Sequence, residues 1–518
     1  MKKKQLRWTL WTIASPFILF IILCILIYLP PIQNFLVDKA AVYASEATGM
    51  NISVGRISLS FPLNLVVTDV DAASPHKDTL LSVRRLQVNV QLLPLLKKQV
   101  EVDGISLQGA TVNSNDLIHG MRLNGTLGEL FISSHGVALD PETAIVNKVL
   151  LKDTDLSLCL NDTAAADTAA SDTTYWKIIL QDIDLQNVSF ALDMPLDSLS
   201  LAASLDNATL RDGLIDLHKS AYSLQTFRIK NGRVRYDSGR PSATASADSL
   251  SAGLDPSHIA LTDIGVKLDS LYYEGRNMKA VISQFVLKER SGVEIVSTEG
   301  RLVSNDKVLR VPSLKLETRD SYLELNAAMD WDALDFKKEG LVSARLMADI
   351  GKPDVVRFMG SMDEKFIRKY PSEPLRIRTG IDGDLNKLKL TTLTAELPGA
   401  LELFAKGELT SLTDSLLRGG DITLQAETKD LKFISTLAEG IEIPYGTRLE
   451  GKFTMAGPKM GTDLLLMQPE AHAVAVADTI PITVYNDSIS VADDFKMERA
   501  ARLFAKYDLS RDRYEADL

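Results

Sequence analysis

The side chains that could carry out chemistry are few and widely separated. The chain has two cysteines, Cys24 and Cys159, and six histidines. No two histidines have the i, i+4 spacing that places two metal ligands on one helix face, and no cysteine pair supplements them. The histidines are His76, His119, His135, His218, His258 and His472. We therefore expect no metal site and no other bound cofactor.

The nearest approach to a catalytic motif lies between Gly446 and Phe453. A phosphate-binding loop needs Ser or Thr after its lysine to hold Mg²⁺, but Phe453 follows Lys452. The sequence has no Gly-x-Ser-x-Gly nucleophile elbow. Its carboxylates fall on the polar faces of predicted strands, where acidic side chains are normally solvated. The sequence thus predicts that the protein is not an enzyme.

The composition is that of a folded protein. Of 518 residues, 45% are apolar and 24% are charged, close to globular averages of roughly 45–50% and 25%. This excludes a wholly disordered chain and a polytopic transporter. The net charge of −11, without basic blocks, also argues against nucleic acid as a partner, because phosphate contacts need clustered Lys and Arg.

The N-terminus predicts a membrane anchor. Residues 1–7 form a basic flank, and the 22 residues from Trp8 to Leu29 carry no charge. As a helix this segment would be roughly 33 Å long, enough to cross a hydrocarbon core of ~30 Å. Aromatic residues near its two ends suit the membrane interfaces. The anchor side chains are Trp8, Trp11, Phe17, Phe20, Leu23 and Tyr28.

The basic flank fixes the expected orientation. Lys2, Lys3 and Lys4 should stay in the cytoplasm, so everything after Pro30 is expected on the other side of the membrane. A cleaved signal peptide is the alternative, but the segment is too long and no small-x-small site follows Leu29. Cys24 is a poor lipoprotein site because bulky Leu23 precedes it.

A short helix is expected within residues 30–49, and strands follow it. Apolar residues from Ile32 to Ala47 have helical spacing, and Gly49 is placed to end the helix. From residue 50 onward, apolar and polar residues alternate with period two, as in strands with one buried face. Such runs include 52–54, 57–61, 86–92, 100–102, 105–107, 188–192, 314–316, 323–325, 388–390 and 401–404.

Turn residues and a few helices interrupt this pattern. Turns are predicted at 102–104, 211–213, 230–232, 381–383 and 418–420, each with Asp-Gly, Asn-Gly or Gly-Gly. An apolar stripe predicts one helix from Pro353 to Tyr370, and a shorter helix is expected from Leu431 to Glu439.

Residues 161–174 are expected to be a disordered loop, since they include no large apolar residue. Asp-Thr triplets at Asp162, Asp167 and Asp172 make this loop a candidate for O-glycosylation or simply a polar linker. The loop divides a first β-region, 50–160, from a second, 175–518. Because the last strand begins only at Tyr514, we expect the chain to be the N-terminal part of something longer or the product of a truncated reading frame.

The fold class that these patterns predict is mainly β. So many strands with so few helices must bury their apolar faces in another way. Separate β-sandwiches would do so. The other solution is one long, curled, open antiparallel sheet, a half-tube with an apolar groove. An apolar surface of that size calls for a ligand or partner.

The ordered features resemble the start of TamB proteins, in the AsmA-like family. They are the basic flank, the anchor, the short helix, Ala47 to Leu59, and Leu65 to Val70. The segments 78–83, 92–96, 285–292 and 314–318 fit the same pattern. The resemblance covers nearly the whole chain, through strand and turn patterns rather than one decisive motif.

The resemblance implies an inner-membrane-anchored periplasmic protein with a grooved β-sheet. That family is linked to lipid transport toward the outer membrane, and to outer-membrane protein assembly with a barrel partner of the TamA type. TamB proteins are usually longer, and the C-terminal domain that meets this partner is not found in these 518 residues. This departure puts the contact with a barrel partner in doubt.

These patterns suggest three functions. In the first, phospholipid acyl chains slide along a groove lined by Ile52, Val54, Leu59, Phe61, Val88, Val90, Val102, Leu316, Leu325, Leu390 and Leu403. In the second, the sheet edge is a scaffold or chaperone that pairs with strands of outer-membrane proteins. The third is a stalk of adhesin-like sandwiches, whose separate domains would be joined by linkers about every ~100 residues.

Overall fold

The structure is a computed structural model, and among the residues that it describes the chain is mainly β, as predicted. The described residues are 39, 41–42, 45, 50–60, 64–74, 79–91, 102–114, 120–138, 142–161, 175–239, 253–335, 337–338, 340–359, 364–412, 414–436, 445–469, 497–508 and 513–517. The predicted anchor and the predicted loop at 161–174 lie almost wholly outside these ranges. Within them, no helix is long and apolar enough to cross a membrane.

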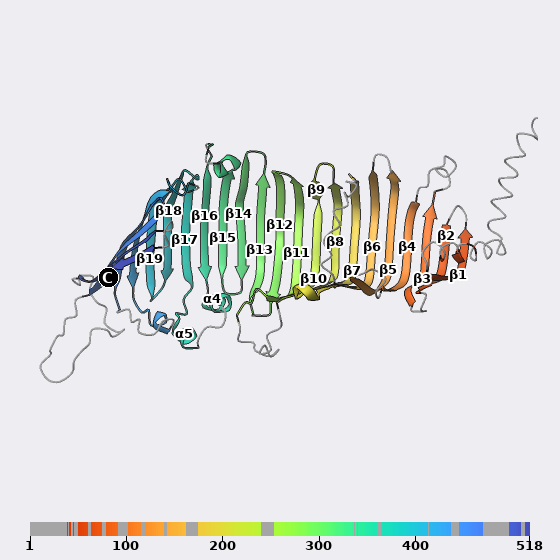
Figure 1. The fold of residues 1–518 in the computed structure, drawn as a ribbon, viewed down its shortest axis with the longest axis horizontal. Helices are drawn as coiled ribbons and strands as arrows, with labels where there is room; N and C mark the ends of the chain where they lie inside the picture. Colours follow the sequence, from red (N-terminus) through yellow and green to blue (C-terminus); the bar gives the residue numbers. More distant parts are fainter. Residues whose placement is uncertain are drawn as a thin grey trace, which may run out of the picture. The chain divides into compact units, whose positions relative to one another are not determined.

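The chain divides into two compact units. In each unit the strands lie side by side and pair with their neighbours (Figure 1). The strands of the first unit are β1 (Asn51–Ser60), β2 (Asn64–Ala73), β3 (Thr79–Val90), β4 (Val102–Asn113), β5 (Met121–Ala138), β6 (Thr143–Leu160), β7 (Lys177–Met194), β8 (Leu199–Asp216), β9 (Ala221–Leu224), β10 (Thr226–Ser238) and β11 (His258–Glu274). A short 3₁₀ helix, η1 (Pro195–Asp197), joins β7 to β8.

The strands of the second unit are β12 (Asn277–Glu289), β13 (Glu294–Ser304), β14 (Val308–Thr318), β15 (Tyr322–Asp330), β16 (Val342–Ile350), β17 (Leu375–Gly383), β18 (Lys387–Leu397), β19 (Leu401–Thr410), β20 (Gly419–Thr428), β21 (Arg448–Ala456), β22 (Lys459–Pro469), β23 (Met497–Asp508) and β24 (Arg513–Asp517). Its helices are η2 (Trp331–Leu334), α4 (Lys352–Phe358), α5 (Glu364–Lys369) and η3 (Ile434–Thr436).

Two predicted helices are corrected by the structure. The single helix expected from Pro353 to Tyr370 is wrong, because α4 ends at Phe358 and α5 begins at Glu364. The helix expected from Leu431 to Glu439 is reduced, within the described residues, to the three residues of η3. Short segments like these gain most of their stability from packing rather than from helix propensity, so an apolar stripe alone overestimates their length.

Neighbouring strands pair antiparallel, with one exception that corrects the expected all-antiparallel sheet. β6 and β7 are parallel, with Thr143 opposite Lys177 and Leu156 opposite Phe190. A hairpin cannot join parallel strands, which need a crossover of about a dozen residues or more. The 16 residues between Leu160 and Lys177 are long enough for such a crossover. The pairing also places the strands on both sides of this connection in one unit.

A row of unusual backbone conformations crosses the strands of the first unit. Asp69, Gly109, Asp153, Asn187 and Asn231 have φ angles between 50° and 62°, in the left-handed region, although each lies inside a strand. The registers align these positions with a residue on each neighbouring strand. We call this row the crease: Gly55, Asp69, Arg84, Gly109, Gly128, Asp153, Asn187, Asp206 and Asn231.

The crease shifts the alternation of each strand by one residue. Two consecutive residues are exposed where it crosses a strand, as at Arg84–Arg85 in β3 and Lys230–Asn231 in β10. Apolar residues keep to one face because their spacing shifts with it: Val54 is followed by Ile57 rather than by residue 56. Irregular positions of this kind bend strands and increase their twist.

Four predicted turns are wrong, because 102–104, 211–213, 230–232 and 381–383 all lie within strands. Asp212 and Asn231 lie within β8 and β10, with φ angles of 51° and 52°. Asp and Asn before Gly favour turns because they tolerate left-handed φ angles. The same tolerance lets them occupy a bend inside a strand, so the sequence signal does not distinguish the two situations.

The second unit has one compact apolar core at one end of its strands. Phe366 and Tyr370, at α5, pack against Phe433, with ring centroids 5.2 to 5.7 Å apart. Leu397 and Leu401, at the β18–β19 turn, complete the contact with the sheet. Figure 1 shows that α4 and α5 both lie beyond the same ends of the strands. Burial raises the pKa of the Tyr370 hydroxyl.

Candidate functional site: an apolar face on each unit

An unbroken row of apolar side chains crosses nine strands of the second unit. Each residue is directly opposite the next, so all stand on one face of the sheet. From β14 to β22 the row is Leu316, Leu323, Ala348, Ile377, Ala395, Leu403, Ala426, Leu449 and Leu466. We call the face that carries it the apolar face of the second unit.

The first unit carries a comparable row across ten strands. Its members are Leu59, Leu65, Val88, Ile105, Ile132, Val149, Ile183, Leu210, Phe227 and Leu268. The row passes through the parallel β6–β7 pair without interruption, because Val149 lies opposite Ile183. We call the face that carries it the apolar face of the first unit.

The residues predicted to line a groove fall on these two faces. Leu59 and Val88 belong to the first row, while Val90 lies opposite Val102. Ile52 and Val54 stand across the crease, opposite Ala72 and Val70. In the second unit, Leu316 and Leu403 belong to the row itself. Leu325 lies opposite Leu314, and Leu390 opposite Ile381, on the same face. Phe61 lies outside the described residues.

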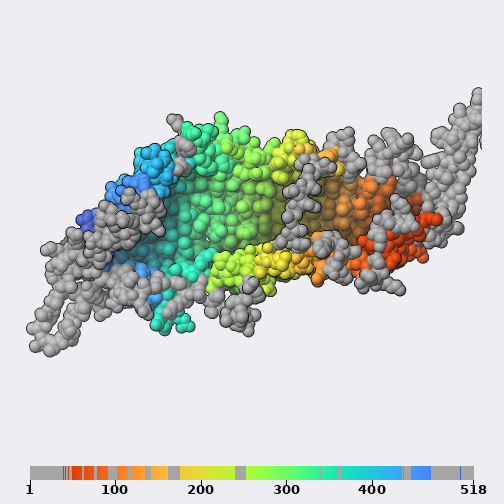
Figure 2. All heavy atoms as spheres, viewed as in Figure 1, coloured from red at the N-terminus to blue at the C-terminus, as the bar shows by residue number. Residues whose placement is uncertain are grey.

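The side chains of both faces are half-buried rather than enclosed. Leu316, Leu325, Leu390 and Leu403 are all of intermediate exposure. Buried apolar residues are few among the described ones, and most of those on the apolar face of the second unit are alanines such as Ala348 and Ala405. Near the β18–β19 turn, side chains of α5 cover part of this face. Figure 2 shows that the side of the second unit turned to the reader is hollowed.

The opposite face of the second unit is polar, and ion pairs connect its neighbouring strands. Arg448 pairs with Glu427 at 2.8 Å, Lys429 with Glu402 at 3.2 Å, and Arg376 with Glu396 at 3.4 Å. All six side chains are substantially exposed, so each pair adds at most about 1 kcal/mol to stability. This face is what the alternation predicts for the solvated side of a sheet.

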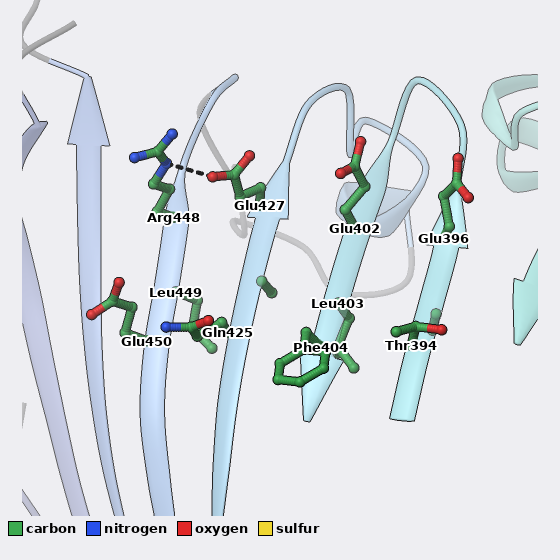
Figure 3. Close-up of a pocket in the computed structure, with 12 residues that line it drawn as sticks. Thr394, Glu396, Glu402, Leu403, Phe404, Gln425, Glu427, Arg448, Leu449 and Glu450 are labelled. Carbon is green, nitrogen blue, oxygen red and sulfur yellow. Dashed lines mark ion pairs between the residues drawn. The ribbon is translucent and has the colours of Figure 1, made fainter. Parts of the chain in front are cut away.

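A shallow hollow of about 530 Å³ lies on the sheet between β18 and β21 (Figure 3). Eight of its twelve lining residues belong to the polar face, including Phe404, Gln425 and Glu450 in one row. The other four belong to the apolar row. Sequence analysis did not single out this hollow, since its residues lie on four strands and only the register brings them together.

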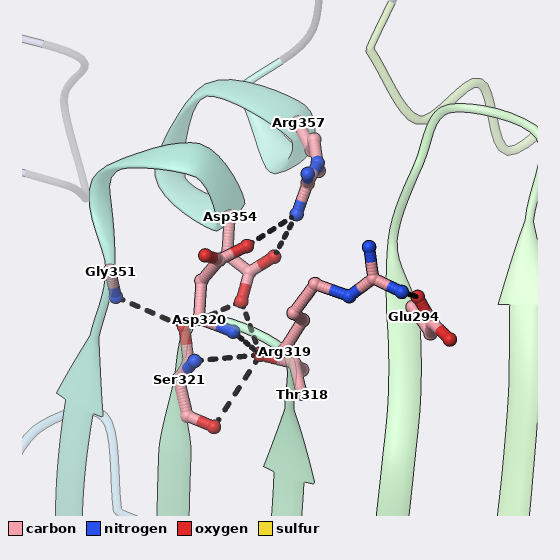
Figure 4. Close-up of polar contacts among 8 residues, drawn as sticks. All are labelled: Glu294, Thr318, Arg319, Asp320, Ser321, Gly351, Asp354 and Arg357. Atoms are coloured by element: carbon pink, nitrogen blue, oxygen red, sulfur yellow. Dashed lines mark hydrogen bonds and ion pairs between the residues drawn. The ribbon is translucent and has the colours of Figure 1, made fainter.

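A buried carboxylate fastens α4 to the β14–β15 turn (Figure 4). Asp354 has no exposed surface and accepts hydrogen bonds from the hydroxyls of Thr318 and Ser321. Its other oxygen pairs with Arg357 at 2.9 Å, and Arg357 also pairs with Asp320 at 2.8 Å. These contacts tie α4 to the β14–β15 turn, which is a structural role. Sequence analysis had not singled out Asp354.

Among the described residues, no three His, Cys, Asp or Glu side chains are placed to hold a metal ion. Of the six histidines, His218 and His258 are at opposite ends of the first unit's strands. Lys452, in the near-match to a phosphate-binding loop, lies in β21 and pairs with Asp421 at 3.2 Å. No helix follows this strand directly, because a turn leads into β22.

Comparison of the sequence with known proteins identified no relative. The chain matches no protein-family model, and no curated protein matches it. The functional argument therefore rests on the two apolar faces and on the patterns of the sequence.

Proposed function

We propose that the chain is an inner-membrane-anchored periplasmic protein that conducts phospholipid acyl chains along a curled, apolar sheet toward the outer membrane. Each unit would form a half-tube with its apolar face inside. The observation that carries this proposal is the unbroken apolar row, which crosses ten strands in the first unit and nine in the second. A TamA-type barrel protein would be the outer-membrane partner, as the sequence resemblance implies.

The physical basis is the cost of exposing acyl chains to water. Each CH₂ kept out of water is worth about 0.8 kcal/mol, so a surface of Leu, Ile and Ala side chains is a favourable path for a lipid tail. A row that is apolar at every strand gives the tail no point at which it must cross polar groups. No covalent step is needed, and the absence of a recognisable nucleophile in the sequence agrees with this.

Photo-crosslinking in intact cells tests the proposal, and the alternation supplies matched controls. A photoreactive residue replaces Leu316 or Leu390, which stand on the apolar face, or their neighbours Lys315 and Lys389, which stand on the polar face. We expect phospholipid adducts at both leucine positions and few at both lysine positions. Lipid adducts at neither leucine, at normal protein level, would rule out the conduit.

The same experiment evaluates the scaffold function. A chaperone that adds client strands would use a sheet edge, where backbone groups are unpaired. Photoreactive residues placed along β1 extend the assay to this edge: protein adducts there, with no lipid adducts at Leu316 or Leu390, would favour that function. At one point this edge is already occupied, because the Ile52 amide donates to the Ser45 hydroxyl at 3.0 Å.

A further inference from the structure

The two ends of the apolar face of the first unit differ in chemistry. At one end its outermost row is Ile178, Ile215, Tyr222 and Tyr273, on β7, β8, β9 and β11. The two tyrosines are cross-strand partners, with ring centroids 6.1 Å apart, and they are 40% and 42% exposed. We call this the tyrosine end. Its outermost row consists of two isoleucines and two tyrosines with exposed phenol rings.

Two ammonium groups stand at the tyrosine end without an ion-pair partner among the described residues. They belong to Lys177, which begins β7, and to Lys219, in the β8–β9 turn, and both side chains are exposed. Two carboxylates nearby are already hydrogen-bonded: Asp216 accepts from the Lys219 backbone amide, and Glu274 from the Tyr272 hydroxyl. Glu142 accepts from the Tyr175 amide in the same way. These hydrogen bonds leave the three carboxylates charged, and Asp216 lies opposite Lys177 in the register. An incoming anion would therefore pair with one of the two ammonium groups rather than meet a net positive charge.

The opposite end of these strands also carries three carboxylates, but no described residue there is a lysine. Asp193 and Asp237 flank Ser200 in the outermost row there, and the exposed Asp197 follows in η1. The Asp193 carboxylate accepts from the Ser200 hydroxyl, and Asp237 pairs with Arg235. Asp197 has no ion-pair partner among the residues that the structure describes. Two aromatic residues lie on the apolar face near this end: Tyr236 is half-buried, and Phe190, one row farther in, is 38% exposed.

We propose that phospholipids lie across the first unit in one orientation, with their phosphate-bearing head groups at the tyrosine end and their tails running along the strands. This inference rests on the lipid conduit proposed above and adds the direction of the lipid on its track. Tyr and Trp suit a boundary between hydrocarbon and water, because one end of the side chain is apolar and the other is polar. Trp176 and Tyr175 stand at the same end, the latter stacked edge-on against His218 at 5.4 Å.

The geometry sets how far a tail should reach. Half of a hydrocarbon core of ~30 Å gives about 15 Å for one tail. A strand rises about 3.3 Å per residue, so the tail would cover roughly five residues of β11. From Tyr273 this reaches Leu268, a member of the apolar row. The far end of the face, at Ile259, lies well beyond the tail.

Tryptophan quenching by brominated phospholipids tests the orientation. The 518-residue chain, with its four tryptophans replaced by phenylalanine, receives one tryptophan by Tyr273→Trp, Leu268→Trp or Ile259→Trp. Each variant is purified with phosphatidylethanolamine that carries bromine either near the ester end or near the methyl end of one tail. Circular dichroism confirms that each variant retains its strands.

We expect Tyr273→Trp to be quenched roughly twofold more by bromine near the ester end, as a boundary position should be. Leu268→Trp should show the opposite preference, and Ile259→Trp should be quenched weakly by both lipids. Adding Lys177→Glu and Lys219→Glu should remove the preference at residue 273.

Two results would overturn the inference. Equal quenching by both lipids at residues 273 and 268 would mean that the lipid has no fixed orientation. Ester-end preference at residue 259 instead of 273 would place head groups at the Asp197 end. Either result leaves the conduit intact, whereas no quenching at any of the three positions would overturn the conduit itself.

Discussion

Left-handed residues inside strands make the crease specific to certain side chains. Asp153 has a φ of 50°, a conformation that costs most residues about 1–2 kcal/mol relative to Gly. Its neighbour Gly128 lies across the strand pair, where an added Cβ would stand 2.8 Å from the Asp153 Cβ. Asn187 donates to the Asp153 carboxylate at 2.9 Å. The residues of the crease therefore depend on one another: Gly128 leaves room for Asp153, and Asn187 binds its carboxylate.

We predict that the order of stability of glycine and alanine reverses between residues 153 and 155. The Asp153→Gly variant should be more stable than Asp153→Ala by about 1 kcal/mol, because only glycine adopts this φ freely. At Asp155, whose φ is negative, alanine should be more stable than glycine by roughly 0.5–1 kcal/mol. Both substitutions remove a carboxylate, so each pair is its own control. Hydrogen exchange of β6 and β7 amides measures the difference, and the same order at both positions would contradict this explanation.

Asp354 should be the most sensitive carboxylate of the second unit. Asp354→Ala leaves the Thr318 and Ser321 hydroxyls without this acceptor and Arg357 with Asp320 alone. Because a buried polar group without its partner costs about 1–3 kcal/mol, we expect a loss of about 2–3 kcal/mol. Asp320→Ala removes the other partner of Arg357, but that carboxylate is 27% exposed, so we expect a loss near ~1 kcal/mol.

Hydrogen exchange in β14, β15 and α4 measures both losses. The amide of Leu254 is a useful reporter, because it donates to the Arg357 carbonyl at 2.8 Å. Equal effects of the two substitutions would mean that burial of Asp354 is not what makes it important.

At the scale of elements, the α5 core is expected to hold one end of the second unit together. Phe366→Ala should cost about 3–5 kcal/mol, since Phe366 is 2% exposed and touches both Tyr370 and Phe433. Phe358→Ala, on α4, is the matched control: its ring is 54% exposed, and the expected change is under ~0.5 kcal/mol. Limited proteolysis across residues 351–374 compares them, and similar protection of both variants would contradict the role of the core.

Much of the element pattern could be predicted from the sequence, and the wrongly placed strand breaks and turns have a common cause. Period-two alternation located β1, but as two runs, 52–54 and 57–61, because the crease at Gly55 shifts its phase. The crease also explains why a turn was predicted at Asn231, which has a left-handed φ inside β10. Alternation records which face a residue takes, whereas a bend inside a strand and a turn between strands use the same Asp, Asn and Gly residues.

At the scale of the whole molecule, the candidate site could be predicted only in its parts. The alternation placed Leu316, Leu325, Leu390 and Leu403 on one face of their own strands. That Leu403 lies between Ala395 and Ala426 in one row depends on strand register, which hydrophobic pattern alone does not determine for loops of unequal length. The parallel β6–β7 pair was missed for the same reason. The apolar rows emerge only when all registers are known.

The proposed conduit makes a final prediction about its start. Residues 39, 41, 42 and 45 are helical, and the Ser45 hydroxyl receives the Ile52 amide hydrogen bond, so this segment is tied to β1. If Trp8–Leu29 anchors the chain, the apolar face of the first unit begins close to the outer leaflet of the inner membrane. A lipid tail could then enter with little exposure, whereas each CH₂ that crosses water adds about 0.8 kcal/mol to the barrier.

We predict that a flexible Gly/Ser linker of about twenty residues, which reaches roughly 25 Å, inserted after Pro31 leaves the protein anchored and folded but impairs lipid movement. The same linker inserted after Asp167, within the predicted loop, lengthens the chain equally without separating anchor from β1, and transport should persist. Transfer of labelled phospholipid from inner to outer membrane, at matched protein levels, compares the two. A wider gap gives the tail more methylenes to carry through water, so a shorter linker should impair transport less. Unchanged transport by the Pro31 insert would show that lipids do not pass directly from the bilayer onto β1, and entry would then have to occur farther along the strands.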